Sequence, residues 1–412
     1  MTALSTLQND ATISYVKPRP YSRRRMLRQS AALGLGAAFA PHIRSETSRL
    51  LAKVHEIQVV SLRPNHYHGW PTLARRRNGQ LLLVCSGGRE MHVCPFGQVE
   101  LMRSDDDGKT WTFPRVLLDL AVDDRDAGIL ETTRGSLLAT SFSSLAYEHY
   151  FRNSEINNWD AARQTRWRGA HHRISEAERK AQLGTWMLRS TDGGVTWSTP
   201  YDSIVNSPHG PIQLADGRQL YAGKDLWKSG KWIGVCESTD DGRSWKKLAQ
   251  IPTRPNDDPG EYHELHAVEA ANGSLVVHIR NHNSPNSRET LQSESNDGGK
   301  TWSVPHSIGV WGLPAHLLRL RDDRLLMTYG YRSNPFGNQA RISTDHGKTW
   351  SKPITISRDG ANGDLGYPST VELQDGILLT AWYEQMTSRP RAILRLAKWS
   401  LLETREHHSL RP

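Results

Sequence analysis

The sequence is poor in cysteine and has no long apolar run. Its 412 residues include only three cysteines, Cys85, Cys94 and Cys236, which cannot all pair within the chain. A disulfide scaffold is therefore disfavoured, although one bridge between Cys85 and Cys94 stays open. No eighteen consecutive residues are apolar, so we expect no membrane span in the mature chain. With 37% hydrophobic and 23% charged residues, the composition disfavours a disordered protein and favours one large globular domain or two ordinary ones.

Basic residues do not cluster outside the N-terminal segment. The formal net charge is +9, but about +5 of it lies in residues 1–28, and later Lys and Arg are scattered among acids. The sequence therefore predicts no nucleic-acid partner. Arg23, Arg24 and Arg25 precede the small apolar run 31–40, which indicates an export signal of twin-arginine type. We expect a signal at 1–40, a linker at 41–55 and a periplasmic or secreted protein.

One eight-residue pattern, S-x-D-x-G-x-[TS]-W, occurs five times, at 104–111, 190–197, 238–245, 295–302 and 343–350. Its Asp can bond to nearby amides and its Gly accepts positive φ, so the pattern predicts a tight turn with Trp as an apolar anchor between sheets. Successive copies begin 86, 48, 57 and 48 residues apart. About fifty residues per unit is typical of a four-stranded propeller blade. The long interval contains the polar segment 147–182, for which we predict a helical or irregular insertion.

Six turn-and-strand segments give the number of blades. They begin at residues 78, 134, 216, 272, 322 and 375, and each has a turn followed by apolar strand residues. The last has no eight-residue pattern after it, so an early strand at 56–62 would complete the sixth blade and close the ring. The sequence thus predicts an all-β fold, a six-bladed β-propeller over 56–400, with the insertion in blade two and a tail at 401–412.

Equivalent positions of the six hairpins should face the central axis together. Nine residues before each turn Gly, or before Asp323 in the fifth hairpin, the sequence has Trp70, Asp126, Pro208, Glu264, Pro314 and Tyr367. Strands more often carry Val or Ile at such positions. The set therefore predicts a functional ring, with polar residues solvated at a sheet end as the alternative.

Five such patterns on six blades resemble the sialidase (neuraminidase) superfamily, over about residues 56–399. The resemblance implies a retaining exo-glycosidase in which Tyr367 is the nucleophile and Glu264 takes its proton. A neutral phenol suits an anomeric carbon that carries a carboxylate. Arg280, sixteen residues after Glu264 across an Asn-Gly turn, matches a family arginine that binds this carboxylate. Arg332 is a second candidate, and Arg89, in a near copy of the Arg332 segment, is another.

The sequence departs from the family twice in blade one. Gly69 stands where sialidases have an arginine, and His92 stands where they have the acid/base aspartate. An imidazole can act as acid or base near neutral pH, so His92 is the catalytic candidate and Asp126 its rival. Trp70 and Asp126 are further substrate-binding candidates.

Three functions stay open. The first is an exported sialidase-like glycosidase that releases a terminal sialic acid or related acidic sugar. The others are a lyase acting on uronate-containing glycans and a non-catalytic carbohydrate-binding propeller. Several histidines lie near strand starts (His209, His263, His266 and His316), but their spacing matches no metal motif, so we predict neither metal nor cofactor. The sequence leaves the oligomeric state open.

Overall fold

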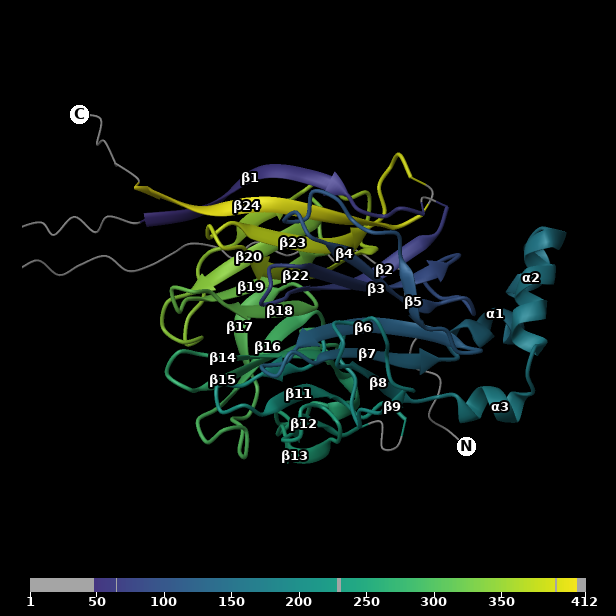
Figure 1. The fold of residues 1–412 in the computed structure, drawn as a ribbon, viewed down its shortest axis with the longest axis horizontal. Coiled ribbons are helices and arrows are strands. Elements are labelled where there is room, and N and C mark those ends of the chain that lie inside the picture. Colours follow the sequence, from purple (N-terminus) through teal and green to yellow (C-terminus); the bar gives the residue numbers. More distant parts are fainter. Residues whose placement is uncertain (1–47, 64, 228–230, 390, 406–412) are drawn as a thin grey trace, which may run out of the picture. The chain divides into compact units, whose positions relative to one another are not determined.

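The computed structural model describes residues 48–405 except 64, 228–230 and 390, and these residues form a six-bladed β-propeller (Figure 1). Each blade is a four-stranded sheet whose neighbouring strands run antiparallel. The predicted fold class is therefore confirmed. The predicted export signal lies outside the described residues. Among the described residues, no helix is long and apolar enough to cross a membrane.

The first three blades follow the chain order, with the innermost strand first. Blade one contains β2 (Tyr67–Arg75), β3 (Leu81–Arg89), β4 (Gln98–Ser104) and β5 (Arg115–Leu118). Blade two contains β6 (Asp123–Glu131), β7 (Leu137–Ser144), β8 (Thr185–Ser190) and β9 (Tyr201–Asp202). Blade three contains β10 (Ile212–Gln213), β11 (Gln219–Lys224), β12 (Ile233–Ser238) and β13 (Lys246–Gln250).

The last three blades continue the order until the ring closes. Blade four contains β14 (Tyr262–Glu269), which follows the 3-10 helix η3 (Pro259–Glu261), then β15 (Leu275–Asn281), β16 (Glu289–Ser295) and β17 (His306–Trp311). Blade five contains β18 (Ala315–Arg319), β19 (Leu325–Tyr331), β20 (Gly337–Ser343) and β21 (Ile354–Ser357). Blade six contains β22 (Leu365–Glu372), β23 (Leu378–Glu384), β24 (Ile393–Arg405) and β1 (Ser48–Val59).

The N-terminal strand closes the ring as the outermost strand of blade six. It pairs antiparallel with β24, from Ser48 opposite Arg405 to Val59 opposite Arg395, with one irregularity between Val54 and Glu56. An early strand in this place was predicted, but it begins earlier than expected. Residues 48–55 are strand rather than linker, and β24 likewise extends into the predicted tail. Both extensions have one cause, because each strand supplies the hydrogen-bonding partners of the other.

Each eight-residue pattern forms a self-contained turn between the third and fourth strands of its blade. In the first copy, Asp106 accepts hydrogen bonds from Ser104 Oγ (2.7 Å), the Thr110 amide (2.9 Å) and Thr110 Oγ1 (2.6 Å). Gly108 has φ of +82°, and Trp111 Nε1 donates to its carbonyl at 3.0 Å. The donors and acceptors of the turn thus lie within eight residues, which explains why the pattern repeats as a unit.

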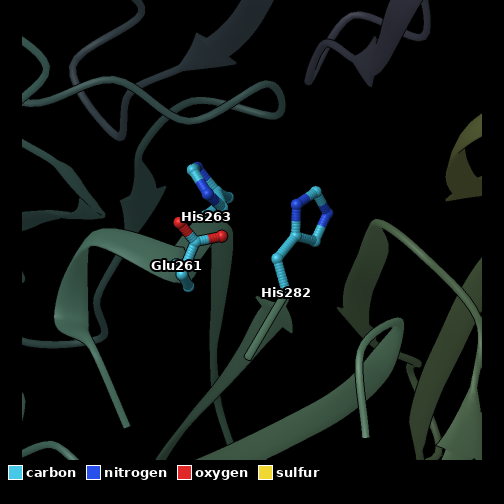
Figure 2. Close-up of side chains that lie close together, drawn as sticks. All are labelled: Glu261, His263 and His282. Carbon is cyan, nitrogen blue, oxygen red and sulfur yellow. The ribbon is translucent and has the colours of Figure 1, made fainter. Parts of the chain in front are cut away.

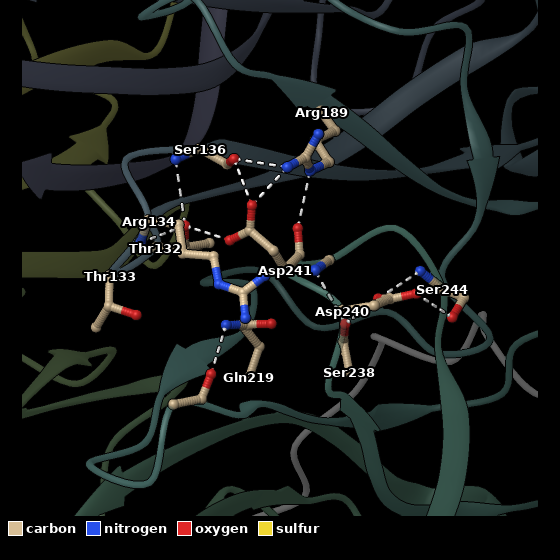
Figure 3. A network of polar contacts seen from close by, with 12 residues as sticks. Thr132, Thr133, Arg134, Ser136, Arg189, Gln219, Ser238, Asp240, Asp241 and Ser244 are labelled. Carbon is tan, nitrogen blue, oxygen red and sulfur yellow. Dashed lines mark hydrogen bonds and ion pairs between the residues drawn. The ribbon is translucent and has the colours of Figure 1, made fainter.

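The turn of blade three also joins its blade to blade two. Figure 3 shows Asp241 facing three side chains of the neighbouring blade. Thr132 Oγ1 and Ser136 Oγ each donate to its carboxylate at 2.6 Å, and Arg189 pairs with it at 2.5 Å. The Asp241 side chain is buried. A buried carboxylate with this many partners stabilises the contact between blades because its charge is compensated locally.

The predicted insertion in blade two is helical. It contains η1 (Ala146–Glu148), α1 (His149–Arg152), η2 (Glu155–Asn158), α2 (Ala161–His172) and α3 (Glu176–Ala181) (Figure 1). Asp160 caps α2 and Ser175 caps α3 through their side chains. Buried Trp167 packs against Phe96 in the loop between β3 and β4. Glu90, at the start of this loop, pairs with Arg163 of α2 at 2.6 Å. The insertion therefore supports the loop that carries His92.

The three cysteines are free and buried. The bridge between Cys85 and Cys94 that the sequence left open is not formed in the structure.

Candidate active site

Four of the six predicted inward positions have a backbone conformation that non-glycine residues rarely adopt. Trp70, Asp126, Glu264 and Tyr367 have φ of 54°, 48°, 46° and 52°. In each case the register of the strand pair shifts at this point, as in a β-bulge. Pro208 and Pro314 hold the other two positions, and proline cannot take positive φ. A β-bulge changes the direction in which a side chain points, and positive φ at a non-glycine residue is a strained backbone conformation that is common at functional sites. Blades one, two, four and six thus share a bulge with positive φ at the same position of the first strand.

Tyr367 and Glu264, from blades six and four, meet directly. The Tyr367 hydroxyl donates to Glu264 Oε1 at 2.5 Å, across 103 residues of sequence. Arg280 NH1 donates to Glu264 Oε2 at 2.6 Å and to the Tyr367 oxygen at 3.2 Å. The predicted nucleophile, its proton acceptor and a candidate carboxylate ligand therefore form one hydrogen-bonded triad.

The charges of this triad suit a neutral phenol beside an ionised carboxylate. Burial, with the negative charge of Glu264, raises the pKa of Tyr367 well above its usual value. Burial alone would also raise the pKa of Glu264, but the Arg280 guanidinium and the Tyr367 hydrogen bond outweigh it and lower this pKa to about 2. Glu264 is therefore ionised at neutral pH and can accept a proton.

His92 belongs to a second cluster, centred on Asp364. His92 Nδ1 lies 2.9 Å from Asp364 Oδ1 and 2.8 Å from the Tyr67 hydroxyl. The hydroxyls of Tyr67 and Tyr383 donate to the same carboxylate oxygen at 2.9 and 3.2 Å. Burial lowers the pKa of His92, and Asp364 opposes this effect. The His92 side chain is 44% exposed, so an imidazole held by a carboxylate faces solvent here.

Asp126, the rival acid, is buried and unpaired at one oxygen. Its Oδ1 has no hydrogen-bond partner among the described residues, and the residue is 6% exposed. Burial raises its pKa to about 7, although Arg125 opposes the shift. A carboxyl group in this state can accept or donate a hydrogen bond to a ligand near neutral pH.

The remaining predicted residues differ in their availability to a substrate. The Arg332 guanidinium carbon lies 5.7 Å from the Tyr367 ring centroid, and among the described residues only its Nε has a hydrogen-bond partner, the Leu365 carbonyl at 2.9 Å. Arg89, in contrast, is fully buried, and its guanidinium bonds to both oxygens of Asp123, at 2.5 and 2.9 Å. Arg89 therefore does not suit the role of substrate ligand that was predicted, because both terminal nitrogens bond within the fold and the residue has no exposed surface.

Arg89 and Trp70 instead hold the site together. Arg89 NH2 donates to the His92 carbonyl at 2.7 Å, which fixes the loop that carries the imidazole. The Trp70 ring is 1% exposed and packs 5.1 Å from the His92 ring and 6.3 Å from the Tyr367 ring. Trp70 thus connects the two clusters and has little surface left for the sugar contact that was predicted.

The structure brings one group of potential metal ligands together among the described residues, Glu261, His263 and His282 (Figure 2). Two cations border this group. Lys224 Nζ lies 3.4 Å from His263 Nδ1, and Arg280 Nε donates to His282 Nε2 at 2.7 Å. A metal ion would be repelled by both charges and would compete with Arg280 for the imidazole. The group is therefore poorly suited to bind a metal, and His282 instead helps to orient Arg280.

Three of the histidines predicted near strand starts, His209, His266 and His316, contact neighbouring blades. His266 Nδ1 accepts from the Leu317 amide at 2.9 Å, and His316 Nδ1 lies 3.4 Å from the Thr370 amide. His209 packs against both rings, and all three are buried. These side chains link neighbouring blades along the axis.

The sequence reasoning missed Asp364, Tyr67 and Tyr383. Asp364 lies three residues before Tyr367, just before β22, and could have been predicted, because residues close to an inward-facing position at a strand start can face the site as well. The prediction used only the position nine residues before each turn. The tyrosines carry no local pattern that marks them.

Comparisons with known proteins agree with this architecture. Residues 170–380 match the family described as "BNR repeat-like domain". A sialidase from Bacteroides fragilis (strain YCH46) is 25% identical over 302 residues, which are 65% of this chain and 51% of that protein. The match thus spans about half the length of this relative.

Two solved structures share the fold. A protein of unknown function from Dyadobacter fermentans DSM 18053 has a TM-score of 0.68 at 23% identity, covering 85% of this chain and 99% of that one. A Hadza microbial sialidase has a TM-score of 0.60 at 17% identity, covering 82% of this chain and 66% of that one. With its six blades and repeated turns, the chain belongs to the BNR repeat-like family, within the superfamily of sialidase-like β-propellers.

Proposed function

We propose that the protein is a retaining exo-glycosidase that releases a terminal sialic acid or related acidic sugar. The observation that carries this proposal is the 2.5 Å hydrogen bond from the Tyr367 hydroxyl to Glu264, with Arg280 bonded to both. The family likeness and the sialidase relative support the substrate class. Export remains part of the proposal, since it rests on residues 1–40 alone.

In the first step the Tyr367 oxygen attacks the anomeric carbon and the bond to the leaving oxygen breaks. Glu264 accepts the phenolic proton as the new bond forms, and Arg280 balances the charge of the carboxylate. In the second step water attacks the same carbon, and the tyrosyl oxygen leaves and recovers its proton from Glu264. Two displacements at one carbon retain its configuration.

His92 is the better candidate for the acid/base, because the leaving group of an exo-enzyme extends toward solvent. The His92 side chain is 44% exposed, whereas Asp126 is 6% exposed. Asp364 holds Nδ1, which leaves Nε2 to donate a proton to the leaving oxygen and to take one from water. Asp126 then serves to bind a sugar hydroxyl through its unpaired oxygen.

The test is hydrolysis of a fluorogenic sialoside, run beside a uronide and a neutral glycoside. Wild-type protein should cleave the sialoside, and Tyr367→Phe should lose at least about 1,000-fold in kcat because the nucleophile is gone. Tyr201→Phe is the matched control, since the Tyr201 hydroxyl bonds to the Gly242 carbonyl of the neighbouring blade. A 3-fluorosialosyl fluoride should label Tyr367, and mass spectrometry of the peptides would locate the label.

Other outcomes would replace the proposal. Ultraviolet absorbance from an unsaturated product on uronate-containing glycans would indicate a lyase. Sugar binding without turnover, equal in wild-type protein and Tyr367→Phe, would indicate a non-catalytic propeller.

A further inference from the structure

Arg125 is a guanidinium without hydrogen-bond partners at the edge of the active site. It lies on β6, one residue before Asp126, and its side chain is 12% exposed. None of its side-chain nitrogens makes a hydrogen bond to the described residues, and its Nε is buried without a partner. Burying a cation in this way is costly unless something pairs with it. The other site arginines, Arg89, Arg280 and Arg332, each bond to the protein.

Asp123, the carboxylate that forms an ion pair with Arg125, makes no hydrogen bond to it. Asp123 Oδ2 lies 3.9 Å from Arg125 NH1, beyond hydrogen-bond distance, and both Asp123 oxygens already bond to Arg89. Asp123 is shared between two guanidiniums, and burial raises the pKa of the neighbouring Asp126 to about 7, so that carboxyl group offsets the charge of Arg125 only in part at neutral pH. That surplus charge favours an anion.

The position of Arg125 connects it to the reacting groups. Its guanidinium carbon lies 4.4 Å from the centroid of the Trp70 ring, and this ring contacts both His92 and Tyr367. Cation–π stacking fixes the plane of the guanidinium while leaving its N–H groups to a ligand. Beside it, Asp126 Oδ1 is buried and unpaired. Two consecutive residues thus have donors and an acceptor that the described residues leave unused.

We propose that Arg125 binds an anionic substituent, a carboxylate or sulfate, of the sugar in the active site. This inference rests on the proposed function and extends it, because it adds a guanidinium from β6, in blade two, to Arg280 and Arg332. Arg280 and Arg332 lie against Tyr367, whereas Arg125 lies against Trp70.

The experiment compares the binding of 2,3-didehydro sialic acid with that of its methyl ester by calorimetry. Arg125→Met keeps an unbranched side chain against Trp70 but removes the charge. Wild-type protein should bind the acid more tightly than the ester, and Arg125→Met should weaken acid binding by about 10- to 100-fold while changing ester binding much less. Arg125→Lys should recover part of the preference for the acid. Arg134→Met, at an exposed turn, is the control and should bind like wild type.

The outcomes separate the inference from the proposed function. If Arg125→Met leaves the ratio of acid affinity to ester affinity unchanged, the role of Arg125 is overturned. The proposed hydrolysis of sialosides is not contradicted by that result. Acid binding that depends on Arg125 in a protein that hydrolyses no sialoside would uphold the inference and overturn the reaction. Wild-type protein that binds neither the didehydro acid, glucuronate nor sulfate would overturn both.

Discussion

Replacing Asp364 with Asn tests whether His92 acts on the leaving group. The Asp364 carboxylate accepts from His92 Nδ1, Tyr67 and Tyr383, and it is the negative charge beside the imidazole. Asn keeps the size of the side chain and one acceptor oxygen but removes the charge. A hydrogen bond to a charged group contributes about 1.5–3 kcal/mol, which corresponds to roughly 10- to 100-fold in rate if the imidazolium is needed in the transition state.

The expected effect depends on the leaving group. An alkyl leaving group, as in sialyllactose, needs protonation, whereas an aryl leaving group departs with little help. Asp364→Asn should therefore lower kcat/KM for the alkyl substrate by about 10- to 100-fold and for the aryl substrate by much less. Asp364 opposes the lowering of the pKa of His92, so its removal lowers this pKa further. Activity that requires protonated His92 should then decline at a lower pH than in wild-type protein.

The assay is the pH dependence of kcat/KM on both substrates, with Tyr383→Phe as the control. The Tyr383 hydroxyl donates to Asp364 at 3.2 Å but does not touch His92, so its loss should leave the ratio of the two substrates unchanged. Equal losses on alkyl and aryl substrates in Asp364→Asn, with no shift of the pH profile, would refute the assignment of His92.

Three further predictions concern stability and metals. Asp241→Asn should lower the free energy of unfolding by about 3 kcal/mol, because Arg189 loses a buried counter-charge, and urea denaturation measures it. Asp107→Asn is the matched control, because Asp107 has the same place in its eight-residue turn as Asp241 and also has positive φ, but is exposed. An equal loss of unfolding free energy in Asp107→Asn would contradict this explanation. Asp126→Asn should melt at a higher temperature than wild type at pH 8, because a pKa of about 7 leaves Asp126 charged and buried in wild-type protein at that pH. The difference in melting temperature should shrink as the pH falls toward 5, because folded wild-type protein then binds the proton. A difference that does not depend on pH would contradict this explanation. Incubation with a chelator should leave sialoside hydrolysis unchanged, and a loss restored by zinc would assign a metal to Glu261, His263 and His282.

The candidate site was predictable where blades repeat the same geometry. Glu264 and Tyr367 were found by one offset from six turns, and the structure joins them at 2.5 Å. The method worked because every blade places its first strand in the same relation to the axis. The prediction of Arg89 as a substrate ligand, made from the likeness of its segment to that of Arg332, was wrong, because whether a guanidinium faces a ligand or Asp123 depends on side-chain direction rather than on local sequence.

The sequence by itself determined the number of blades, the turns and the insertion, since the bonds from Ser and from the Thr or Ser amide to the Asp of each turn lie within eight residues and recur in every copy. Only the tertiary structure decided that Asp364 holds His92, 272 residues away, and that Arg125 lies against Trp70 without a side-chain hydrogen bond to the described residues. These contacts join different blades at single positions. No periodic pattern records them, because they arise from how folded blades face each other across the axis.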